Sequence, residues 1–146
     1  MNKKILISTG GSGGHVIPAT IIYKHLEDNF DVSMTSDFRG VKFLNKGEYN
    51  LKIFNVRRIS KNLLLMPFDF LLMITLIFKS ISFLRKNKID TLISTGGYMS
   101  FPLCVGAKIL NIKLLLFEPN MVLGRSNKFF ISYCQKIFCY SNNVKK

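Results

Sequence analysis

The chain has 146 residues, of which 48% are hydrophobic, and its formal net charge is +13. This length suits one domain with a hydrophobic core, and the charge favours an anionic partner such as nucleic acid, anionic lipid or a phosphorylated substrate, although a basic bias without any specific partner gives the same composition. Cys104, Cys134 and Cys139 form no CxxC pair and the N-terminus lacks the long apolar region of a signal peptide, so we expect a cytosolic chain without a disulfide framework or a metal site.

A glycine-rich loop dominates the N-terminal part of the chain. Residues 4–9 predict a buried parallel strand, four glycines follow between positions 10 and 14, and Pro18 marks the first turn of a helix over residues 18–29. Glycines let the backbone approach an anion closely, and a helix N-terminus offers unpaired N–H groups. We therefore expect an anion site rather than a purely structural turn, with His15 at its mouth and with Ile21 facing the sheet.

Two further strands are predicted over residues 31–36 and 51–56, with a short helix and a turn in the polar segment 40–50. Asp37 follows the first of these strands, in the position of the acid that binds ribose in dinucleotide folds. The glycine loop departs from that fingerprint because Val16 holds the place of its third glycine, and it lacks the Gly-Lys-Ser/Thr of a P-loop. A nucleotide fold of the dinucleotide type therefore stays a minor alternative.

Residues 63–86 are the most hydrophobic part of the chain. We predict a helix over residues 68–86 with one narrow polar stripe, formed by Thr75, Lys79, Ser82 and Lys86. The segment is too short and too interrupted, by Pro67 and Asp69 among others, for a transmembrane helix of about 20 apolar residues.

The apolar surface of this helix exceeds the arc of roughly 100° that packing on a sheet requires. The surplus is either buried deep in the core or in contact with a membrane interface. Basic neighbours suit an anionic bilayer surface, and they are Arg57, Arg58, Lys61, Lys79, Arg85, Lys86 and Lys88. The residues expected on the membrane face are Phe70, Leu72, Ile74, Ile77, Phe78 and Lys79.

The C-terminal half continues the alternation, with strands over 90–95, 113–117 and 136–139 and helices over 99–110 and 126–133. Strands that alternate with helices predict an α/β domain with a parallel sheet. Gly96-Gly97-Tyr98 and Glu118-Pro119-Asn120 each follow a predicted strand, as the glycine loop does. Because ligands bind off the carboxyl ends of such strands, we expect these three sequences to converge on one cleft.

These three sequences also carry a family resemblance. Residues 10–19, GGSGGHVIPA, resemble the signature loop of the MurG family, the GlcNAc transferases of peptidoglycan synthesis. Residues 95–102, TGGYMSFP, resemble its second motif, and residues 117–120, FEPN, with Gly124, Arg125 and Asn127 resemble its third. The motifs stand in the family's order and cover essentially the whole chain. Ser12 replaces a usual Thr, Phe117 a usual His and Pro119 a usual Gln.

The resemblance implies a Rossmann-like parallel sheet with helices on both faces, the N-terminal half of a GT-B glycosyltransferase. It implies one acceptor-binding domain over residues 1–146, without the family's C-terminal donor domain. The family moves GlcNAc from UDP-GlcNAc to the C4 hydroxyl of MurNAc in lipid I, an undecaprenyl-pyrophosphoryl pentapeptide sugar, and forms lipid II with inversion. It implies a peripheral protein at the cytoplasmic face of the inner membrane, with no cofactor, no metal and no nucleic acid.

The resemblance also implies site residues. An inverting transfer needs a base for the acceptor hydroxyl, for which His15 is the first choice and Glu118 the second. The residues assigned to UDP-GlcNAc are Ser12, Gly13, Gly14 and Asn120. Those assigned to the acceptor pyrophosphate are Gly10, Gly11, Ser12, Gly13, Gly14, His15, Gly96, Gly97 and Tyr98. A cap on the following segment is the alternative role for Glu118, and packing against the adjacent loop is the alternative for Tyr98.

Two other functions stay open from the sequence. One is an acceptor-binding or membrane-anchoring subunit of a split GlcNAc transferase, as in the two-subunit eukaryotic enzyme for dolichol-linked sugars. The other is a stand-alone nucleotide-binding Rossmann module. If the chain is instead the acceptor domain of a MurG-type transferase, it is expected on its own to bind a lipid pyrophosphate and to transfer little or no sugar.

Overall fold

The computed structural model describes residues 3–45, 47–54, 56 and 64–140. Within these residues a six-stranded sheet has the order β3-β2-β1-β4-β5-β6, and every neighbouring pair is parallel. Its strands are β1 (Lys4–Ser8), β2 (Asp31–Ser36), β3 (Leu51–Ile53), β4 (Thr91–Ser94), β5 (Lys113–Glu118) and β6 (Lys136–Cys139). This is the order of a Rossmann-type sheet, in which the direction of winding reverses between β1 and β4.

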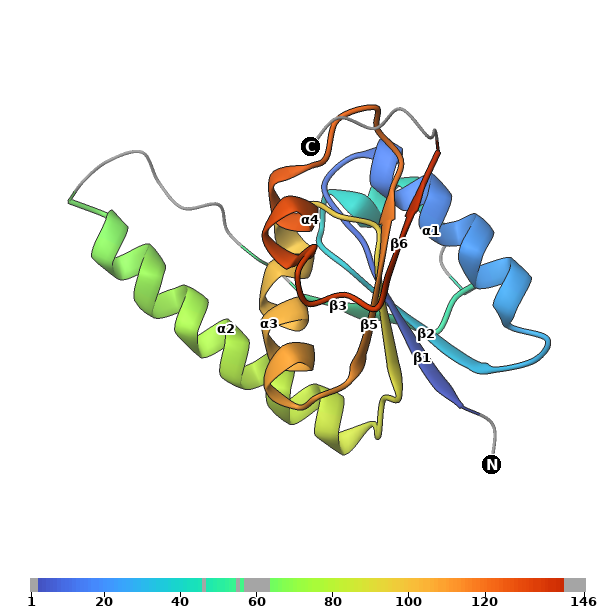
Figure 1. The fold of residues 1–146 in the computed structure, drawn as a ribbon, viewed down its shortest axis with the longest axis horizontal. Coiled ribbons are helices and arrows are strands. Elements are labelled where there is room, and N and C mark those ends of the chain that lie inside the picture. The colour runs from blue at the N-terminus through green and yellow to red at the C-terminus, as the bar shows by residue number, and fades with distance from the viewer. Residues whose placement is uncertain (1–2, 46, 55, 57–63, 141–146) are drawn as a thin grey trace.

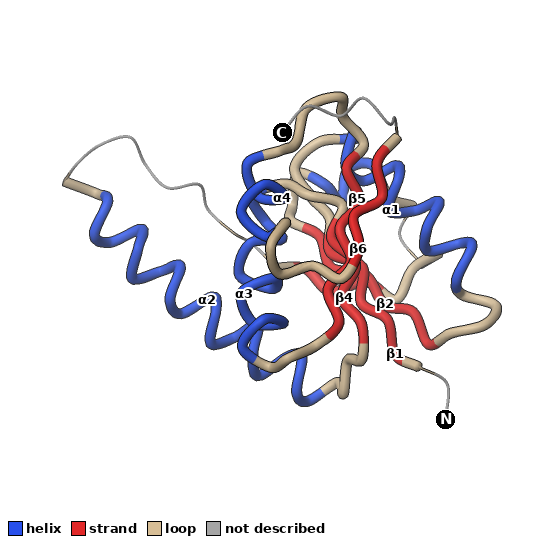
Figure 2. Tube along the Cα trace, viewed as in Figure 1, coloured by secondary structure: helices blue, strands red, loops and turns tan. Residues whose placement is uncertain are grey.

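Helices cover both faces of the sheet (Figure 1), which confirms the predicted fold class. One face carries α1 (Gly13–Leu26), and the other carries α2 (Met66–Lys86), α3 (Phe101–Ile109) and α4 (Arg125–Phe130). Two short 3-10 helices, η1 (Gly40–Phe43) and η2 (Tyr98–Ser100), follow β2 and β4. Figure 2 shows the strands as one central layer between the two sets of helices.

The core divides into two clusters, one on each face of the sheet. Leu6 and Leu92 pack with residues of α2 and α3, whereas Ile5, Ile7 and Ile93 pack against α1. Successive residues of a strand point to opposite faces, so a short apolar strand with both faces covered supplies both clusters. This double burial holds the carboxyl ends of β1 and β4 in fixed register beside each other.

The predicted elements exist, and the main error lies at the start of α1. The helix begins at Gly13 rather than at residue 18, because Ser12 has the extended backbone of an N-cap and the next two glycines are already helical. Pro18 therefore lies inside the helix, where its missing N–H removes the bond to the carbonyl of Gly14. Ile21 is exposed and does not face the sheet, since Val16, Ala19 and Tyr23 are the buried positions of α1.

α2 is one continuous helix. The prediction that this segment is too short and too interrupted for a transmembrane helix is therefore wrong by length and composition. Pro67 lies in the first turn, where a missing N–H costs no intrahelical bond, and Asp69 is buried. The helix is long enough and apolar enough to cross a membrane, by length and composition alone. Of its most apolar 18-residue stretch, 22% is buried inside the structure. Its second half packs closely on α3, where a Cβ added at Gly106 would lie 3.2 Å from Leu84 Cδ1. Its first half projects away from the sheet (Figure 1).

The residues predicted for the membrane face of this helix divide between surface and core. Phe70, Leu72, Phe78 and Lys79 are exposed, and Ile74 is half-buried. Ile77 packs against the core cluster of the α2 and α3 face, so its assignment to an outer face is wrong. The helical phase explains the error, because Ile77 lies four residues after the buried Met73. The basic residues Arg57, Arg58 and Lys61 lie outside the described residues.

Candidate functional site

The three motifs meet at the carboxyl edge of the sheet, on both sides of the point where the strand order reverses. A Cβ added at Gly97 would lie 3.1 Å from the carbonyl oxygen of Gly10. One added at Gly96 would lie 3.3 Å from His15 Cε1 and 3.3 Å from Asn127 Nδ2. Both glycines have positive φ, 88° and 84°. Only glycine fits this contact and this backbone without strain, so the second motif closes onto the first and the third.

The glycine loop uses some of its N–H groups internally. Gly11 N–H donates to Asp37 Oδ1 at 2.9 Å, and Ser12 N–H donates to the carbonyl of Gly10 at 3.2 Å. In the described part of the chain, no acceptor receives the N–H groups of Gly13 and Gly14 at the start of α1, and the Ser12 side chain makes no capping bond. An anion at this loop therefore meets the amides of Gly13 and Gly14 and the Ser12 hydroxyl, rather than the amide of Gly11.

His15 lies in the first turn of α1, half-buried between the first two motifs. Its Nδ1 lies 2.8 Å from the carbonyl oxygen of Thr95. A carbonyl can only accept, so a neutral imidazole must carry its proton on Nδ1 and leave Nε2 as a lone-pair acceptor. The ring is thus held in the tautomer that a general base requires.

Glu118 is fully buried and both of its carboxylate oxygens accept hydrogen bonds. Oε1 accepts from the backbone N–H of Asn120 at 3.1 Å and from its side-chain amide at 2.9 Å. Oε2 accepts from Gly124 N–H at 2.8 Å and from Asn127 Nδ2 at 3.0 Å. This geometry corresponds to the alternative of a cap on the following segment, and it does not support Glu118 as a base.

The remaining predicted residues occupy different depths of the site. Asn120 is exposed, with its amide N–H₂ directed to Glu118, and Ser12 is exposed at the loop. Tyr98 is half-buried and packs against the core cluster of the α2 and α3 face. Asn127 was part of the third motif without an assigned role, and the structure places it against Gly96 and Glu118 with a buried Oδ1 that has no partner among the described residues.

Asp37 and Arg39 lie beside the glycine loop. The sequence gives Asp37 a different role, as a ribose-binding acid, and gives Arg39 none. The Asp37 carboxylate accepts from the N–H groups of Gly11 and Gly40 and from the Arg39 guanidinium. Burial alone raises the pKa of Asp37, but these hydrogen bonds outweigh it and hold the pKa below its ordinary value. Both carboxylate oxygens of Asp37 already accept hydrogen bonds and its side chain is buried, so the prediction of a ribose-binding acid is wrong.

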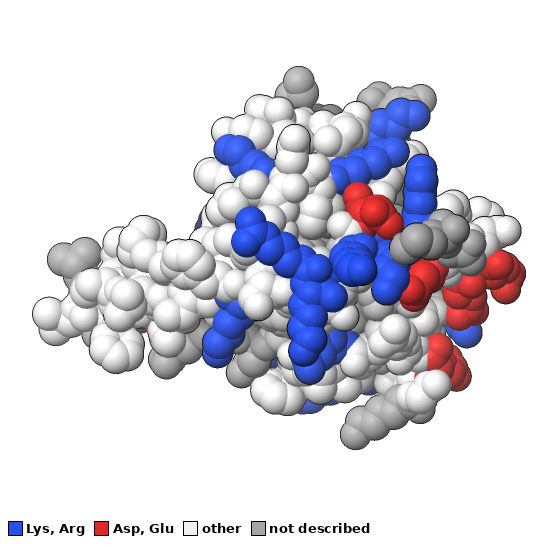
Figure 3. Space-filling model, turned by 90° about the horizontal axis from the view of Figure 1, so that it is seen from below, with Lys and Arg blue, Asp and Glu red and all other residues white. Residues whose placement is uncertain are grey.

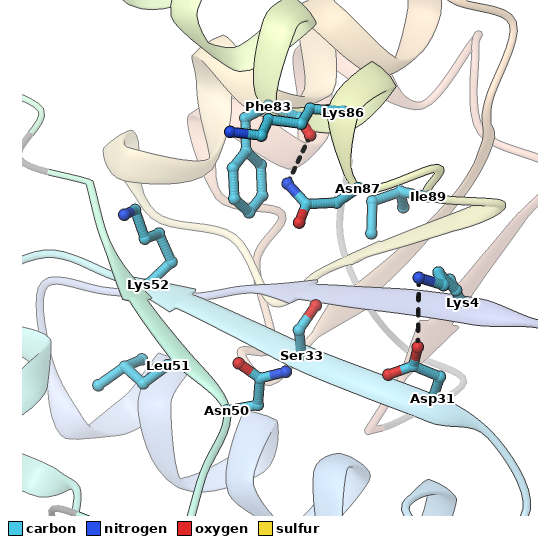
Figure 4. Close-up of a pocket in the computed structure, with 10 residues that line it drawn as sticks. All are labelled: Lys4, Asp31, Ser33, Asn50, Leu51, Lys52, Phe83, Lys86, Asn87 and Ile89. Carbon is cyan, nitrogen blue, oxygen red and sulfur yellow. Dashed lines mark hydrogen bonds and ion pairs between the residues drawn. The ribbon is translucent and has the colours of Figure 1, made fainter.

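A hollow of about 340 Å³ lies at the opposite edge of the sheet, between the end of α2 and the strands β2 and β3 (Figure 4). Lys4 and Asp31 form an ion pair of 3.6 Å at its rim, and Lys52 and Lys86 line it. These residues belong to none of the three motifs. The hollow is therefore separate from the candidate site.

The chain matches the family model of the glycosyltransferase family 28 N-terminal domain over residues 5–139. It is 90% identical over 146 residues to the UDP-N-acetylglucosamine–N-acetylmuramyl-(pentapeptide) pyrophosphoryl-undecaprenol N-acetylglucosamine transferase of Pelagibacter ubique. It is 33% identical over 145 residues to the enzyme of the same name from Rickettsia prowazekii. The match covers 100% and 98% of this chain but only 41% and 37% of these relatives, so the chain spans about two fifths of their length.

Solved structures show the same fold. The structure of Acinetobacter baumannii MurG matches with a TM-score of 0.83 and 22% identity, over 99% of this chain and 43% of that one. A UDP-GlcNAc 2-epimerase from Neisseria meningitidis, bound to UDP-GlcNAc, matches with a TM-score of 0.64 and 16% identity, over 97% of this chain and 41% of that one. From its motifs, its sheet order and the family model, the chain belongs to the glycosyltransferase family 28 N-terminal domains.

Proposed function

We propose that this chain is the acceptor-binding part of an inverting GlcNAc transferase that converts lipid I to lipid II. In this proposal the glycine loop holds the pyrophosphate of the acceptor, and the donor UDP-GlcNAc is shared with a second domain. The names of the relatives support this reaction. The chain matches about two fifths of their length, which supports a role on the acceptor side of the reaction. On their own, these 146 residues are expected to bind a lipid pyrophosphate and to transfer little or no sugar.

The observation that carries the proposal is the pairing of His15 with Thr95 beside free helix amides. The contact with Thr95 keeps His15 Nε2 as an acceptor. His15 directly follows Gly13 and Gly14 in the chain, and the amides of these two glycines suit an anion. A sugar hydroxyl presented on a pyrophosphate needs both features close together. The base removes the C4 hydroxyl proton while C4–OH attacks the anomeric carbon of GlcNAc, and UDP leaves with the bonding electrons.

The experiment uses the Pelagibacter relative with this chain in place of its matching 146 residues. We expect this hybrid to transfer radiolabelled GlcNAc to lipid I, and the 146-residue chain alone to bind lipid I without transfer. A folded hybrid that leaves lipid I unchanged would contradict the proposed reaction. Transfer by the chain alone would contradict its assignment to the acceptor side only.

The first half of α2 supplies the proposed membrane contact of a peripheral protein at the cytoplasmic membrane face. Phe68 and Phe70 have exposed fractions of 68% and 63%, and Leu71 is similarly exposed. Figure 3 shows this projecting part at the left as uncharged surface, with Lys and Arg side chains gathered on the neighbouring body. Exposed apolar groups next to basic ones match the surface of an anionic bilayer.

We expect the double change Phe70→Ser and Leu71→Ser to weaken binding of the chain to phosphatidylglycerol vesicles by at least about tenfold. Two large side chains would then no longer enter the interface, and each contributes roughly 1.5–3 kcal/mol when fully buried. Vesicle co-sedimentation at low salt measures the effect. The matched control is Ile17→Ser with Ile21→Ser, which removes exposed apolar groups from α1 on the other face of the sheet. Equal binding by both double variants would contradict the assignment to α2.

A further inference from the structure

Residues 37–43 follow β2 and fold against the glycine loop. A Cβ added at Gly40 would lie 3.0 Å from Gly10 Cα, and one added at Gly13 would lie 3.2 Å from Phe43 Cε1. Asp37, with 2% of its side chain exposed, ties the two parts together through Oδ1, which accepts from Gly11 N–H at 2.9 Å and from Gly40 N–H at 2.8 Å. The shape of the loop therefore depends on this segment as well as on its own glycines.

Arg39 is held beside the glycine loop by Oδ2, the second carboxylate oxygen of Asp37. Its Nε and Nη2 donate to Asp37 Oδ2 at 2.9 Å and 2.7 Å, which fixes the plane of the guanidinium. The side chain stays 48% exposed, and a Cβ added at Gly11 would lie 3.7 Å from Nη2. Within the described residues no acceptor pairs with Nη1. A cation with unused donors thus stands next to the loop, fixed before any ligand arrives.

We propose that Arg39 is a direct contact for the diphosphate group that the glycine loop binds, and that Asp37 positions it for this contact. This inference rests on the proposed function and names a recognition residue for the same site. A guanidinium donates in a planar fork that matches phosphate oxygens, and a fork held by a buried carboxylate loses little freedom on binding. Arg39 then supplements the Gly13 and Gly14 amides, because the amide of Gly11 is committed to Asp37.

A different role for Arg39 would be to neutralise the Asp37 carboxylate and nothing more. Replacing Arg39 would then weaken anion binding only through repulsion by the uncompensated Asp37. The change Asp37→Asn removes that charge and keeps an Oδ1 acceptor for Gly11 and Gly40. A double variant therefore separates a contact from a neutralising role.

The test measures inorganic pyrophosphate binding to the 146-residue chain by calorimetric titration at low salt. We expect Arg39→Gln to weaken binding by about 10- to 100-fold, since a charge-assisted hydrogen bond is lost. The double variant Asp37→Asn with Arg39→Gln is expected to stay equally weak. The matched control is Arg85→Gln, an exposed arginine in the last turn of α2, which is expected to bind as the unchanged chain does. Thermal unfolding checks that each variant is folded.

Restored binding in the double variant, or an unchanged affinity in Arg39→Gln, would overturn the inference, as would a chain that binds no pyrophosphate. GlcNAc transfer by the hybrid with the Pelagibacter relative separates this result from the proposed function. If the hybrid transfers GlcNAc and Arg39→Gln binds normally, only the inference fails. If Arg39→Gln loses pyrophosphate binding and the folded hybrid transfers nothing, only the proposed function fails.

Discussion

Replacing His15 with Gln in the hybrid enzyme is expected to lower the rate of GlcNAc transfer by about 10²- to 10⁴-fold, the usual contribution of a general base. The structure gives the reason, because the Thr95 carbonyl fixes the proton on Nδ1 and leaves Nε2 to accept the proton of the sugar hydroxyl. Steady-state kinetics should show the loss mainly in kcat, with the KM for UDP-GlcNAc little changed.

The control for this change is His25→Gln. His25 is the chain's other histidine, and it lies in the last turn of the same helix, at the opposite end from the glycine loop. The control removes the same ring from α1 without touching the three motifs, so activity should stay within about twofold. If His15→Gln kept most of its activity, the base would have to be another group.

Replacing Glu118 with Ala is expected to lower the free energy of unfolding by about 3 kcal/mol or more, because a fully buried carboxylate is removed and four donors, that of the buried Asn127 among them, lose their acceptor at once. For a chain of this size that corresponds to a decrease in Tm of roughly 6–12 °C. The donors are the backbone N–H groups of Asn120 and Gly124 and the side-chain amides of Asn120 and Asn127. Differential scanning calorimetry of the 146-residue chain measures the change.

The companion change Glu118→Gln distinguishes a structural carboxylate from a base. Gln keeps an acceptor oxygen for Asn120 and turns its amide towards the donors of Gly124 and Asn127, so an intermediate loss of stability is expected. The hybrid carrying Glu118→Gln should retain the pH profile of transfer. A stable Glu118→Gln hybrid that lost transfer by 10²-fold or more would return Glu118 to the role of base.

The local pattern of the sequence determined the alternation of strands and helices, and two strands, 31–36 and 136–139, have the bounds that their apolar pattern predicts. The meeting of the three motifs also followed from the sequence, because a parallel sheet brings every carboxyl end to one edge. The start of α1 did not follow, since Pro18 is a good first-turn residue and the pattern offers no sign that Gly13 and Gly14 are already helical.

The roles within the site needed the tertiary structure, because hydrogen bonds between residues far apart in the chain decide them. From the sequence Glu118 is a possible base, but four donors from the following loop and α4 occupy its carboxylate. The tautomer of His15 is fixed only through Thr95, 80 residues away. Asp37 and Arg39 lie 26 and more residues beyond the loop that they hold, so spacing along the chain did not connect them with Gly11. The order of strands and loops along the chain shows which residues reach the carboxyl edge, and the packing there decides which of them keep an atom available for a ligand.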